Sequence, residues 1–590
     1  MLNRNQILYK RIRITSFIFF TANAIILSKM LFIQSFKSEQ LKDNTYKFGR
    51  TERTASGNRG KVLDKDGEIL AQSIPKYTFW VNSKKHYEKD KIIKLFSAEF
   101  DKPREYYLSL LKNKRKYVKI EDGLFRMECA NILAQINEIE GLHYDMSVDR
   151  FYPHKNLFSQ VLGYVDADNQ GQFGIEREFN SILEGKLEQR TYSRSANGRI
   201  RQLEYSELNK NTNGLDIQLT LDVDMQDILV HALNNGLDRS KAKSASGIIL
   251  DPFNGDILAM ASIPDYDPNN YKEYNVDVFS NRVISESYEP GSTFKLIAMA
   301  ALLESKKFSP EDMIFCENGK YQILPQKTIH DHEPYDYLSV SEVFIYSSNI
   351  GLVKLVKELG DASIYNFARK FGFGIQTGIP LPSESSGLLR QYNQWSRLSG
   401  FSISMGQEIA VNTLQLGLAY SAVANGGYLP APRIIKNIYG EGYDMNDFSP
   451  IPIRRVISKN TSKILLDMME GVVTQGTASK AGIPGYKIGG KTGTAEKFIE
   501  GRYSSKFFIS SFASIFPIDD PRYVCVISVD SPIYGFHWGN ETAAPIVKEI
   551  FERIILKFDF EPNLTNYSNL NSNQVNNGNL SYKSLRKLEL

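Results

Sequence analysis

The sequence predicts a membrane-anchored protein of the α/β (α+β) class, in which a mixed α/β module precedes a larger domain with a central antiparallel sheet and a helical subdomain. Three observations lead to this prediction. A long apolar segment, Ile14 to Ile33, stands near the N-terminus. Short β-like runs alternate with charged helical segments between residues 59 and 210. Between residues 211 and 558, two hairpin-like pairs of apolar runs flank a mostly helical stretch.

The N-terminal segment is about as long as a bilayer-spanning helix. Lys29 interrupts it close to one end, where a long side chain can reach the interface. Four basic residues precede the segment, so residues 1–13 should form a cytoplasmic tail, residues 14–34 the anchor and residues 35–58 a polar linker. The alternative is a cleaved signal peptide, because Ile14 to Leu27 is a short uninterrupted core. No small-residue cleavage site follows that core, which favours an uncleaved single-pass anchor.

The module predicted over residues 59–210 combines the run Tyr77–Val81, typical of a strand, with helical patterns at Lys91–Phe100 and Met127–Ile136. It carries no cluster of candidate catalytic residues. A structural or partner-binding role follows.

The larger domain, predicted over residues 211–558, contains recognisable strands and helices. An Asn-Gly pair, Asn254-Gly255, marks the turn of its first hairpin. The predicted elements are a strand at Ile217–Asp222, a helix at Asp224–Leu237, a hairpin over Gly247–Ala261, a second hairpin from Phe507–Ala513 to Tyr523–Val529, and a helix at Pro545–Ile555. Residues 559–590 are rich in Asn and Ser, so they should be disordered.

Composition excludes several other classes. The 590 residues are 42% hydrophobic and 23% charged, values typical of a globular chain with two or three domains. A net charge of +4 leaves no nucleic-acid-binding footprint. Cys129, Cys316 and Cys525 are far apart, so they predict neither a disulfide framework nor a metal site. His330-Asp331-His332 would supply at most an incomplete metal site, and a loop or supporting role is favoured.

The first chemical motif is Ser292-Thr293-Phe294-Lys295, which fits S-x-x-K. It follows the turn Glu289-Pro290-Gly291 and precedes the apolar run Leu296–Leu303, as expected for the start of a buried helix. Residues three apart share a helix face, so Ser292 and Lys295 can meet. Burial and the helix N-terminus both disfavour an ammonium, so Lys295 could be neutral and accept the serine proton. The alternative is an N-capping serine followed by a solvated lysine.

Two further motifs follow in order. Ser347-Ser348-Asn349 fits S-x-N and comes after Val340–Tyr346, which looks helical. Lys491-Thr492-Gly493-Thr494 lies in a strand-like run, Tyr486–Lys497, whose glycines suggest the close approach of another backbone. An extended peptide could add to that strand as a further strand. The alternatives are a polar turn and an ordinary edge lysine.

Each motif also has a decoy. Ser240–Lys243 fits S-x-x-K, and Ser195–Asn197 fits S-x-N. Both lie in highly charged or Gly/Ser/Arg-rich stretches where we predict no helix. Order and context therefore select Ser292 and Ser347.

Together the three motifs resemble the signature of serine enzymes that acylate themselves on D-Ala-D-Ala peptides or β-lactams. The chain resembles a class B penicillin-binding protein, a peptidoglycan D,D-transpeptidase, along nearly its whole length. Arg59–Gly67 is similar to the family's entry into a pedestal, or dimerisation-like, domain. Further pedestal residues that resemble the family are Tyr152-Pro153, Gly163, Gly174-Ile175-Glu176, Leu183 and Gly185.

Within the class, three details resemble the division-specific, septal type. They are the sequence Glu289-Pro290-Gly291, the threonine at position 492, and a short pedestal. One departure is Glu408, at the end of Met405-Gly406-Gln407-Glu408, where the family usually has glycine.

The resemblance implies roles for the motif residues. Ser292 would be the nucleophile, Lys295 its general base and Ser347 the group that passes a proton to the leaving D-alanine. Asn349 would hold the substrate backbone. Lys491 would attract the substrate carboxylate, Thr492 and Thr494 would donate hydrogen bonds, and Gly493 completes that motif. The backbone N–H groups of Ser292 and Thr494 would form the oxyanion hole. No metal or organic cofactor is implied.

The implied partners are peptidoglycan stem peptides on the lipid-linked precursor polymer, β-lactams as inhibitors, a septal glycan polymerase of the lipid-flippase-like family, and other division proteins. Asn23, a polar residue in the apolar segment, would mark a helix–helix contact. The expected location is the inner membrane at the division site, with the catalytic domain outside. An elongation-type transpeptidase, a D,D-carboxypeptidase, a β-lactamase, a β-lactam-sensing receptor and a silent division scaffold remain alternatives.

Overall fold

The computed structural model describes residues 4–36, 50–112, 115–185, 187–194, 200–202, 213–440, 443–445, 448–499 and 501–562. Contacts between Cα atoms divide the chain into two compact units. The first comprises residues 1–58 and 185–213, and the second comprises residues 59–184 and 214–590.

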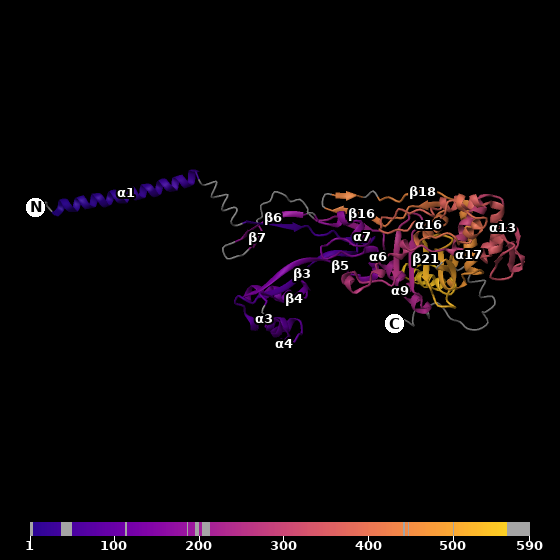
Figure 1. Ribbon diagram of the computed structural model, residues 1–590, viewed down its shortest axis with the longest axis horizontal. Helices are drawn as coiled ribbons and strands as arrows, with labels where there is room; N and C mark the ends of the chain where they lie inside the picture. Colours follow the sequence, from indigo (N-terminus) through magenta and orange to yellow (C-terminus); the bar gives the residue numbers. More distant parts are fainter. Residues whose placement is uncertain are drawn as a thin grey trace. The chain divides into compact units, whose positions relative to one another are not determined.

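The first unit contains one long helix, α1 (Arg4–Phe36), drawn in indigo in Figure 1. In the described part of the chain, α1 is the one helix long and apolar enough to cross a bilayer. It begins at Arg4, so the basic residues expected in a tail form its first turns. The Asn23 side chain donates a hydrogen bond to the Phe19 carbonyl, 2.9 Å away, which satisfies one of its amide hydrogens inside the helix.

A small antiparallel sheet completes this unit, in the order β1-β6-β7. Its strands are β1 (Arg50–Ser56), β6 (Leu187–Arg194) and β7 (Ile200–Gln202). Strand β1 lies within the segment predicted as a linker. Its residues are polar and show no apolar alternation, so only the pairing partner some 135 residues away reveals it.

The second unit is built around a five-stranded antiparallel sheet in the order β10-β9-β21-β20-β19. Its strands are β9 (Ser244–Leu250), β10 (Ile257–Ile263), β19 (Gly489–Ile499), β20 (Arg502–Phe516) and β21 (Tyr523–Asp530). The inner strand β9 is buried along its whole length, because helices cover both faces of the sheet. Strand β19 forms one edge.

Helices α9 (Val223–Ser240) and α18 (Ala543–Lys557) pack on one face, and α16 (Thr413–Ala424) packs on the other. The alternation of side chains along β9 sets this arrangement. A Cβ on Gly247 would meet Leu229 of α9, whereas Ile248 and its neighbour Leu250 contact α16 at Gly417. Helix α17 (Lys459–Thr474) packs beside β19.

Between β10 and α16 lies the predicted helical subdomain. Its helices are α10 (Arg282–Ser285), α11 (Lys295–Glu304), α12 (Val340–Ile345), α13 (Asn349–Leu359), α14 (Asp361–Lys370) and α15 (Ser399–Ser404). Two-stranded pairs in this segment join β11 (Met313–Phe315) to β14 (Tyr337–Ser339) and β12 (Lys320–Leu324) to β13 (Lys327–His330). After α16, β15 (Tyr428–Pro430) pairs with β18 (Pro452–Arg455).

A second large sheet has the order β17-β16-β8-β2-β3-β4, with β5 also paired to β3. Its strands are β2 (Val62–Leu63), β3 (Ile69–Asn82), β4 (Tyr117–Phe125), β5 (Leu142–Phe151), β8 (Asp216–Leu219), β16 (Ile435–Gly440) and β17 (Tyr443–Met445). Val62 pairs in parallel with Ile217. The sheet thus runs across the domain boundary predicted at residues 210 and 211.

The far end of β3, β4 and β5 has its own core. Helices α3 (Lys89–Glu99), α4 (Arg104–Leu111) and α5 (Ala130–Gln135) supply it together with Phe79 and Val81 of β3. Three short helices, α6 (Ser159–Leu162), α7 (Gly174–Glu178) and α8 (Asn180–Leu183), follow β5.

The predicted strands and helices of the second unit are present, with boundaries shifted by a few residues. The prediction that no helix includes the decoy at Ser240–Lys243 is wrong for its first residue, because α9 continues to Ser240. It is the last residue of that helix, is 1% exposed, and donates its hydroxyl to the Gly236 carbonyl at 2.7 Å. Burial therefore excludes it as a nucleophile. The decoy at residues 195–197 and the tail from residue 563 lie outside the described residues.

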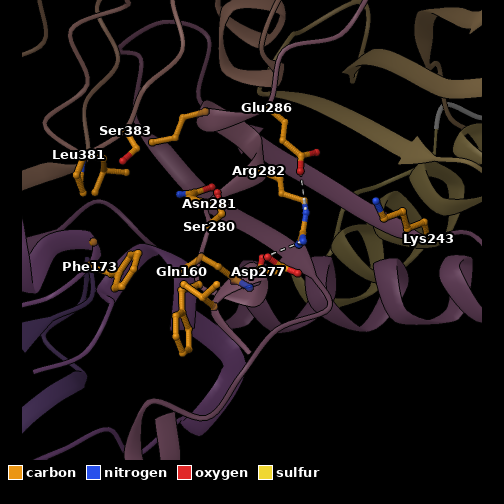
Figure 2. Close-up of a pocket in the computed structure, with 15 residues that line it drawn as sticks. Gln160, Phe173, Lys243, Asp277, Ser280, Asn281, Arg282, Glu286, Leu381 and Ser383 are labelled. Carbon is orange, nitrogen blue, oxygen red and sulfur yellow. Dashed lines mark hydrogen bonds and ion pairs between the residues drawn. The ribbon is translucent and has the colours of Figure 1, made fainter. Parts of the chain in front are cut away.

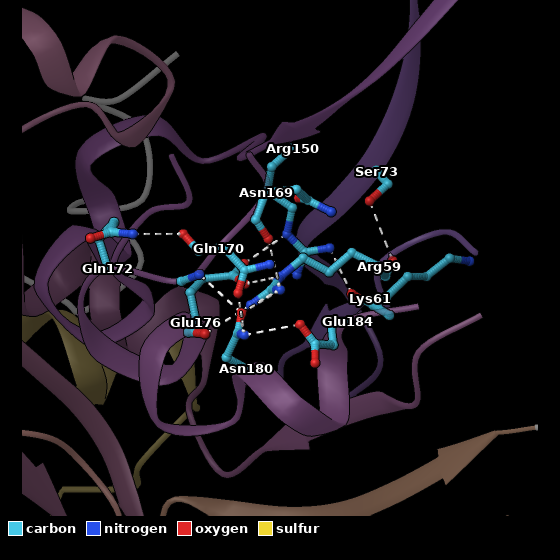
Figure 3. A network of polar contacts seen from close by, with 12 residues as sticks. Arg59, Lys61, Ser73, Arg150, Asn169, Gln170, Gln172, Glu176, Asn180 and Glu184 are labelled. Carbon is cyan, nitrogen blue, oxygen red and sulfur yellow. Dashed lines mark hydrogen bonds and ion pairs between the residues drawn. The ribbon is translucent and has the colours of Figure 1, made fainter. Parts of the chain in front are cut away.

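A buried ion network holds the base of the pedestal together (Figure 3). Glu176 of α7 is fully buried and receives Arg59 Nε at 2.6 Å on one carboxylate oxygen and Arg150 Nε at 2.7 Å on the other. Arg59 also donates to the Asn180 side chain at 2.8 Å, and Arg150 to the Gly60 carbonyl at 2.6 Å. The network links the start of the pedestal to β5 and the helices after it.

Removing the charge of Glu176 should destabilise the pedestal, because two buried guanidinium groups would lose their counter-ion. We expect Glu176→Gln to lower the free energy of unfolding by about 3–5 kcal/mol, measured by denaturant titration. Glu178→Gln, on the exposed face of the same helix, is the matched control and should change little. If both substitutions change the free energy of unfolding by the same amount, the buried ion network does not stabilise the fold.

Candidate active site

Ser292 lies on a single 3₁₀ turn, Gly291–Phe294, that leads directly into α11. Gly291 has φ of 54°, in the left-handed region that glycine favours. The Thr293 hydroxyl donates to the Pro290 carbonyl at 2.8 Å, and the Tyr420 hydroxyl of α16 donates to the Thr293 carbonyl at 2.9 Å. The turn is thereby fixed from both sides. Ser292 itself is half-buried.

Lys295 is the first residue of α11 and is 1% exposed. Its Nζ donates to the Ser347 carbonyl at 2.6 Å and to Asn349 Oδ1 at 2.7 Å. Burial lowers the pKa of Lys295 to about 7, against the opposing effect of the Asp331 charge. The sequence predicts a contact with Ser292. Among the described residues, no hydrogen bond joins the Ser292 hydroxyl to Lys295.

The S-x-N motif forms the junction between α12 and α13. Ser347 adopts a left-handed conformation, with φ of 61°, which is costly for a residue with a side chain and is typical of functional positions. Ser348 caps α13, since its hydroxyl accepts the Gly351 N–H at 2.9 Å. Asn349 donates its side-chain N–H to the His330 carbonyl at 2.9 Å, which orients its oxygen towards Lys295.

The third motif lies on the edge strand β19. Lys491 is completely buried, and both burial and the charge of nearby Lys295 lower its pKa well below the usual value. Its Nζ lies 5.9 Å from the centre of the Phe344 ring. Thr492 shares a hydrogen bond of 2.9 Å with the Thr477 hydroxyl. The structure therefore places Lys491 in the interior, where its charge interacts with that of Lys295.

Glycine at position 493 is a steric requirement. A Cβ there would lie 2.4 Å from Ser511 Oγ and 2.6 Å from the Pro290 carbonyl oxygen. A Cβ on Gly291 would likewise lie 3.0 Å from the Thr494 carbonyl oxygen. The glycines thus let β19 pack directly against the turn that carries Ser292, as the strand pattern suggests.

Ser292, Asn349 and Thr494 line the same cleft, whose volume is about 250 Å³. Its other walls are mostly apolar, and polar atoms come from a few side chains, as in typical ligand sites. The remaining wall residues include Ile323, Ile329, His330, Leu398, Phe401, Met405 and Gln407. Ser347 and Lys491 do not line this cleft.

A larger cavity, of about 600 Å³, contains none of the motif residues (Figure 2). It lies among Gln160, Phe173 and the residues around α10. Its most buried charged side chain, Arg282, is paired with Glu286 at 3.0 Å and with the Asp277 carbonyl at 3.1 Å. The smaller cleft is therefore the candidate active site.

Glu408, the departure from the family glycine, has φ of 57°. This is the backbone region that glycine favours, as the resemblance to the family pattern implies for this position. In this chain the side chain binds Arg390 and accepts the Ser399 hydroxyl at 2.9 Å. Its N–H donates to Glu289 at 2.8 Å, three residues before Ser292. The loop is thus held by its neighbours despite the strained conformation.

Sequence reasoning missed three supporting residues. Thr477 shares a hydrogen bond with Thr492 of the third motif. The Tyr503 hydroxyl donates to the Glu289 carboxylate at 3.1 Å, close to Ser292 in the sequence. Neither has a local sequence signal. Asp331 stands out in the sequence only for its flanking histidines, yet its carboxylate binds the start of α13.

Comparison with known proteins agrees with this geometry. Residues 245–552 match the family model for the penicillin binding protein transpeptidase domain, and residues 54–219 match the model for the penicillin-binding protein dimerisation domain. The chain is 31% identical to the peptidoglycan D,D-transpeptidase FtsI homolog of Mesostigma viride, covering 94% of this chain and 97% of that protein. It is 30% identical to peptidoglycan D,D-transpeptidase FtsI of Buchnera aphidicola, with 95% and 97% covered.

Solved structures give the same result. Penicillin binding protein 3 of Mycobacterium tuberculosis, complexed with aztreonam, has a TM-score of 0.67 and 26% identity, covering 86% of this chain and 98% of that one. Penicillin binding protein 2X of Streptococcus thermophilus has a TM-score of 0.72, with 86% and 80% covered. At 22% identity, the latter comparison shows the fold alone.

The lowered pKa of Lys295 predicts that the acylation rate depends on pH. The neutral amine can accept a proton and the ammonium cannot, so acylation by a fluorescent penicillin should slow as the pH falls through about 7. Lys295→Arg should acylate about 10²–10⁴-fold more slowly at every pH, because arginine stays protonated. Stopped-flow or quenched labelling measures both. An arginine variant with near wild-type rates would show that a positive charge suffices.

Proposed function

The chain belongs to the class B penicillin-binding proteins, and we propose that Ser292 is the residue that its acyl-transfer chemistry acylates. The protein is a serine-type peptidoglycan D,D-transpeptidase of the FtsI-like kind. One observation supports the residue assignment most. Lys295 Nζ is held by both residues of the S-x-N motif that flank Ser348, while Ser292, Asn349 and Thr494 line one cleft.

The first step acylates the enzyme. The Ser292 oxygen attacks the carbonyl carbon between the two D-alanines of a donor stem peptide, and its proton passes to neutral Lys295. A neutral amine has two hydrogens, and both already point at acceptors, Ser347 O and Asn349 Oδ1. Its lone pair is therefore left to accept the serine proton. We assign stabilisation of the tetrahedral oxyanion to the N–H groups of Ser292 and Thr494.

The bond to the terminal D-alanine then breaks, and the departing amine takes a proton. We assign this transfer to the Ser347 hydroxyl, which would pass on the proton that Lys295 received, because the Ser347 carbonyl accepts a hydrogen bond from Lys295 Nζ at 2.6 Å. In the second step, an amine from a neighbouring stem peptide attacks the ester, and Ser292 recovers its proton as the cross-link forms. A β-lactam would stop at the first step, with its opened ring bound to Ser292.

The substrate peptide can be held along β19, because an edge strand presents unpaired backbone groups to a further strand. Apolar wall residues such as Phe401 and Met405 would exclude water from the ester. Limited water access favours transfer to an amine over hydrolysis, which separates this function from a D,D-carboxypeptidase or a β-lactamase.

The proposed setting is the inner membrane at the division septum. Helix α1 is compatible with a single-pass anchor, and its basic N-terminal end would stay in the cytoplasm. The second unit would then act on the lipid-linked polymer outside. The proposed partners are the septal glycan polymerase, through α1, and other division proteins, through the pedestal.

The assignment of the nucleophile predicts a single adduct. Mass mapping of the full-length protein after penicillin labelling should find the adduct on Ser292, and Ser292→Ala should abolish it. Ser240→Ala, which alters the buried decoy, should label like the wild type. An adduct on Ser240 or Ser347 would overturn the assignment.

The septal role predicts a division phenotype. Depleting the protein should give filaments with stalled constrictions, because cross-linking at the septum would stop while elongation continues. Microscopy of dividing cells measures this. Round or swollen cells that still divide would identify the elongation-type enzyme instead.

A further inference from the structure

Asp331 lies in the connection from β13 to β14, and the described hydrogen bonds of its carboxylate go to the start of α13. One carboxylate oxygen accepts the backbone N–H groups of Asn349 at 2.5 Å and Ile350 at 3.0 Å. The other accepts the Ser348 hydroxyl at 2.6 Å. From a separate segment of the chain, Asp331 thus makes two hydrogen bonds to the S-x-N motif and a third to Ile350, the residue after it.

This arrangement is favourable for two physical reasons. The first N–H groups of a helix have no partner inside it, so a carboxylate there satisfies them. The positive end of the helix dipole also favours a negative charge. Charge-assisted hydrogen bonds of this kind are short and roughly twice as strong as neutral ones.

The residue before Asp331 binds the other side of Asn349. The His330 carbonyl accepts the Asn349 side-chain N–H at 2.9 Å, so adjacent residues hold the backbone and the amide of Asn349. The Asn349 oxygen is thereby fixed 2.7 Å from Lys295 Nζ. Because Ser347 precedes this anchored turn, its carbonyl is held in place as well.

Asp331 also acts on Lys295 through its charge. Its negative charge raises the pKa of Lys295, in opposition to burial, which lowers it. A second charged group that interacts with this lysine is Lys491, on β19. Asp331 therefore counters part of the cost of placing two lysines in one buried site.

We propose that Asp331 is a positioning residue for the acylation reaction, which holds Asn349 and the Ser347 carbonyl against Lys295. The proposal rests on the function proposed above for Ser292 and Lys295. Asp331 contacts neither of these two residues by a described hydrogen bond and does not line the cleft. Its effect on the reaction passes through the S-x-N turn.

The test compares penicillin acylation rates of full-length protein in detergent across pH. Asp331→Asn keeps the size of the side chain and removes its charge. Its maximal rate should fall about tenfold or more, since charge-assisted contacts become neutral ones. The pH at which the rate declines on acidification should also move downwards, because Lys295 loses a group that favours its protonated form. Glu333→Gln, an exposed acid two residues away, is the matched control and should match the wild type.

Ser348→Ala separates positioning from simple helix capping. It removes one hydrogen bond and the cap but leaves the carboxylate, so the melting temperature should fall while the acid decline stays at the wild-type pH. If Asp331→Asn lowers the melting temperature and the rate but leaves the acid decline unmoved, Asp331 is a cap only and the proposal fails. An unchanged rate also overturns it.

Two further outcomes are informative. If Asp331→Asn does not fold, Asp331→Glu serves instead. It keeps the charge on a longer side chain, so the maximal rate should fall with the acid decline unmoved, and an unchanged rate refutes the proposal. Absence of an adduct on Ser292 in the wild type would refute the proposed function first, and the role of Asp331 with it.

Discussion

The burial of Lys295 is the constraint on which the site depends. A lysine in an apolar interior is unfavourable as an ammonium, and it is tolerated only where acceptors satisfy its hydrogens. Here the acceptors come from a junction between two helices, Ser347 O and Asn349 Oδ1, some fifty residues along the chain. The same burial that would destabilise a charged lysine makes it a base near neutral pH. Stability and reactivity are thus opposed at this residue.

The elements around Lys295 hold three backbone segments in contact: the turn that carries Ser292, strand β19 and the start of α13. Helix α16 fixes the turn at Thr293 through Tyr420, and glycine at position 493 lets β19 approach that turn. Asp331 fixes the third segment, the start of α13. The large sheet and its helices provide rigidity, and the site residues lie on short connections, at the starts of helices α11 and α13, and on the edge strand β19. Such a division is common in enzymes whose catalytic groups must be preorganised.

Sequence patterns predicted much of this molecule because its strands and helices carry strong local signals. The hairpin at Asn254-Gly255 and the motif glycines are examples. The pattern at Ser292 also predicted burial of Lys295, but not its partners, since hydrogen bonds across fifty residues leave no local trace. Strand β1 pairs with a strand that is distant in the sequence, so its own residues predict only a linker. Glu408 shows the limit of family patterns, because a left-handed residue can be held by side-chain contacts that a motif does not include.

The order of strands in the central sheet has a consequence for the biosynthesis of the protein. Strands β9 and β10 leave the ribosome early, but β9 pairs on its other side with β21, which is made nearly three hundred residues later. This edge of β9 therefore stays unpaired while nearly half of the chain is made, a state prone to wrong association. Such distant pairings also fold slowly. The cell must protect a nascent hairpin for many seconds, and truncated chains that end before Tyr523 cannot complete the sheet.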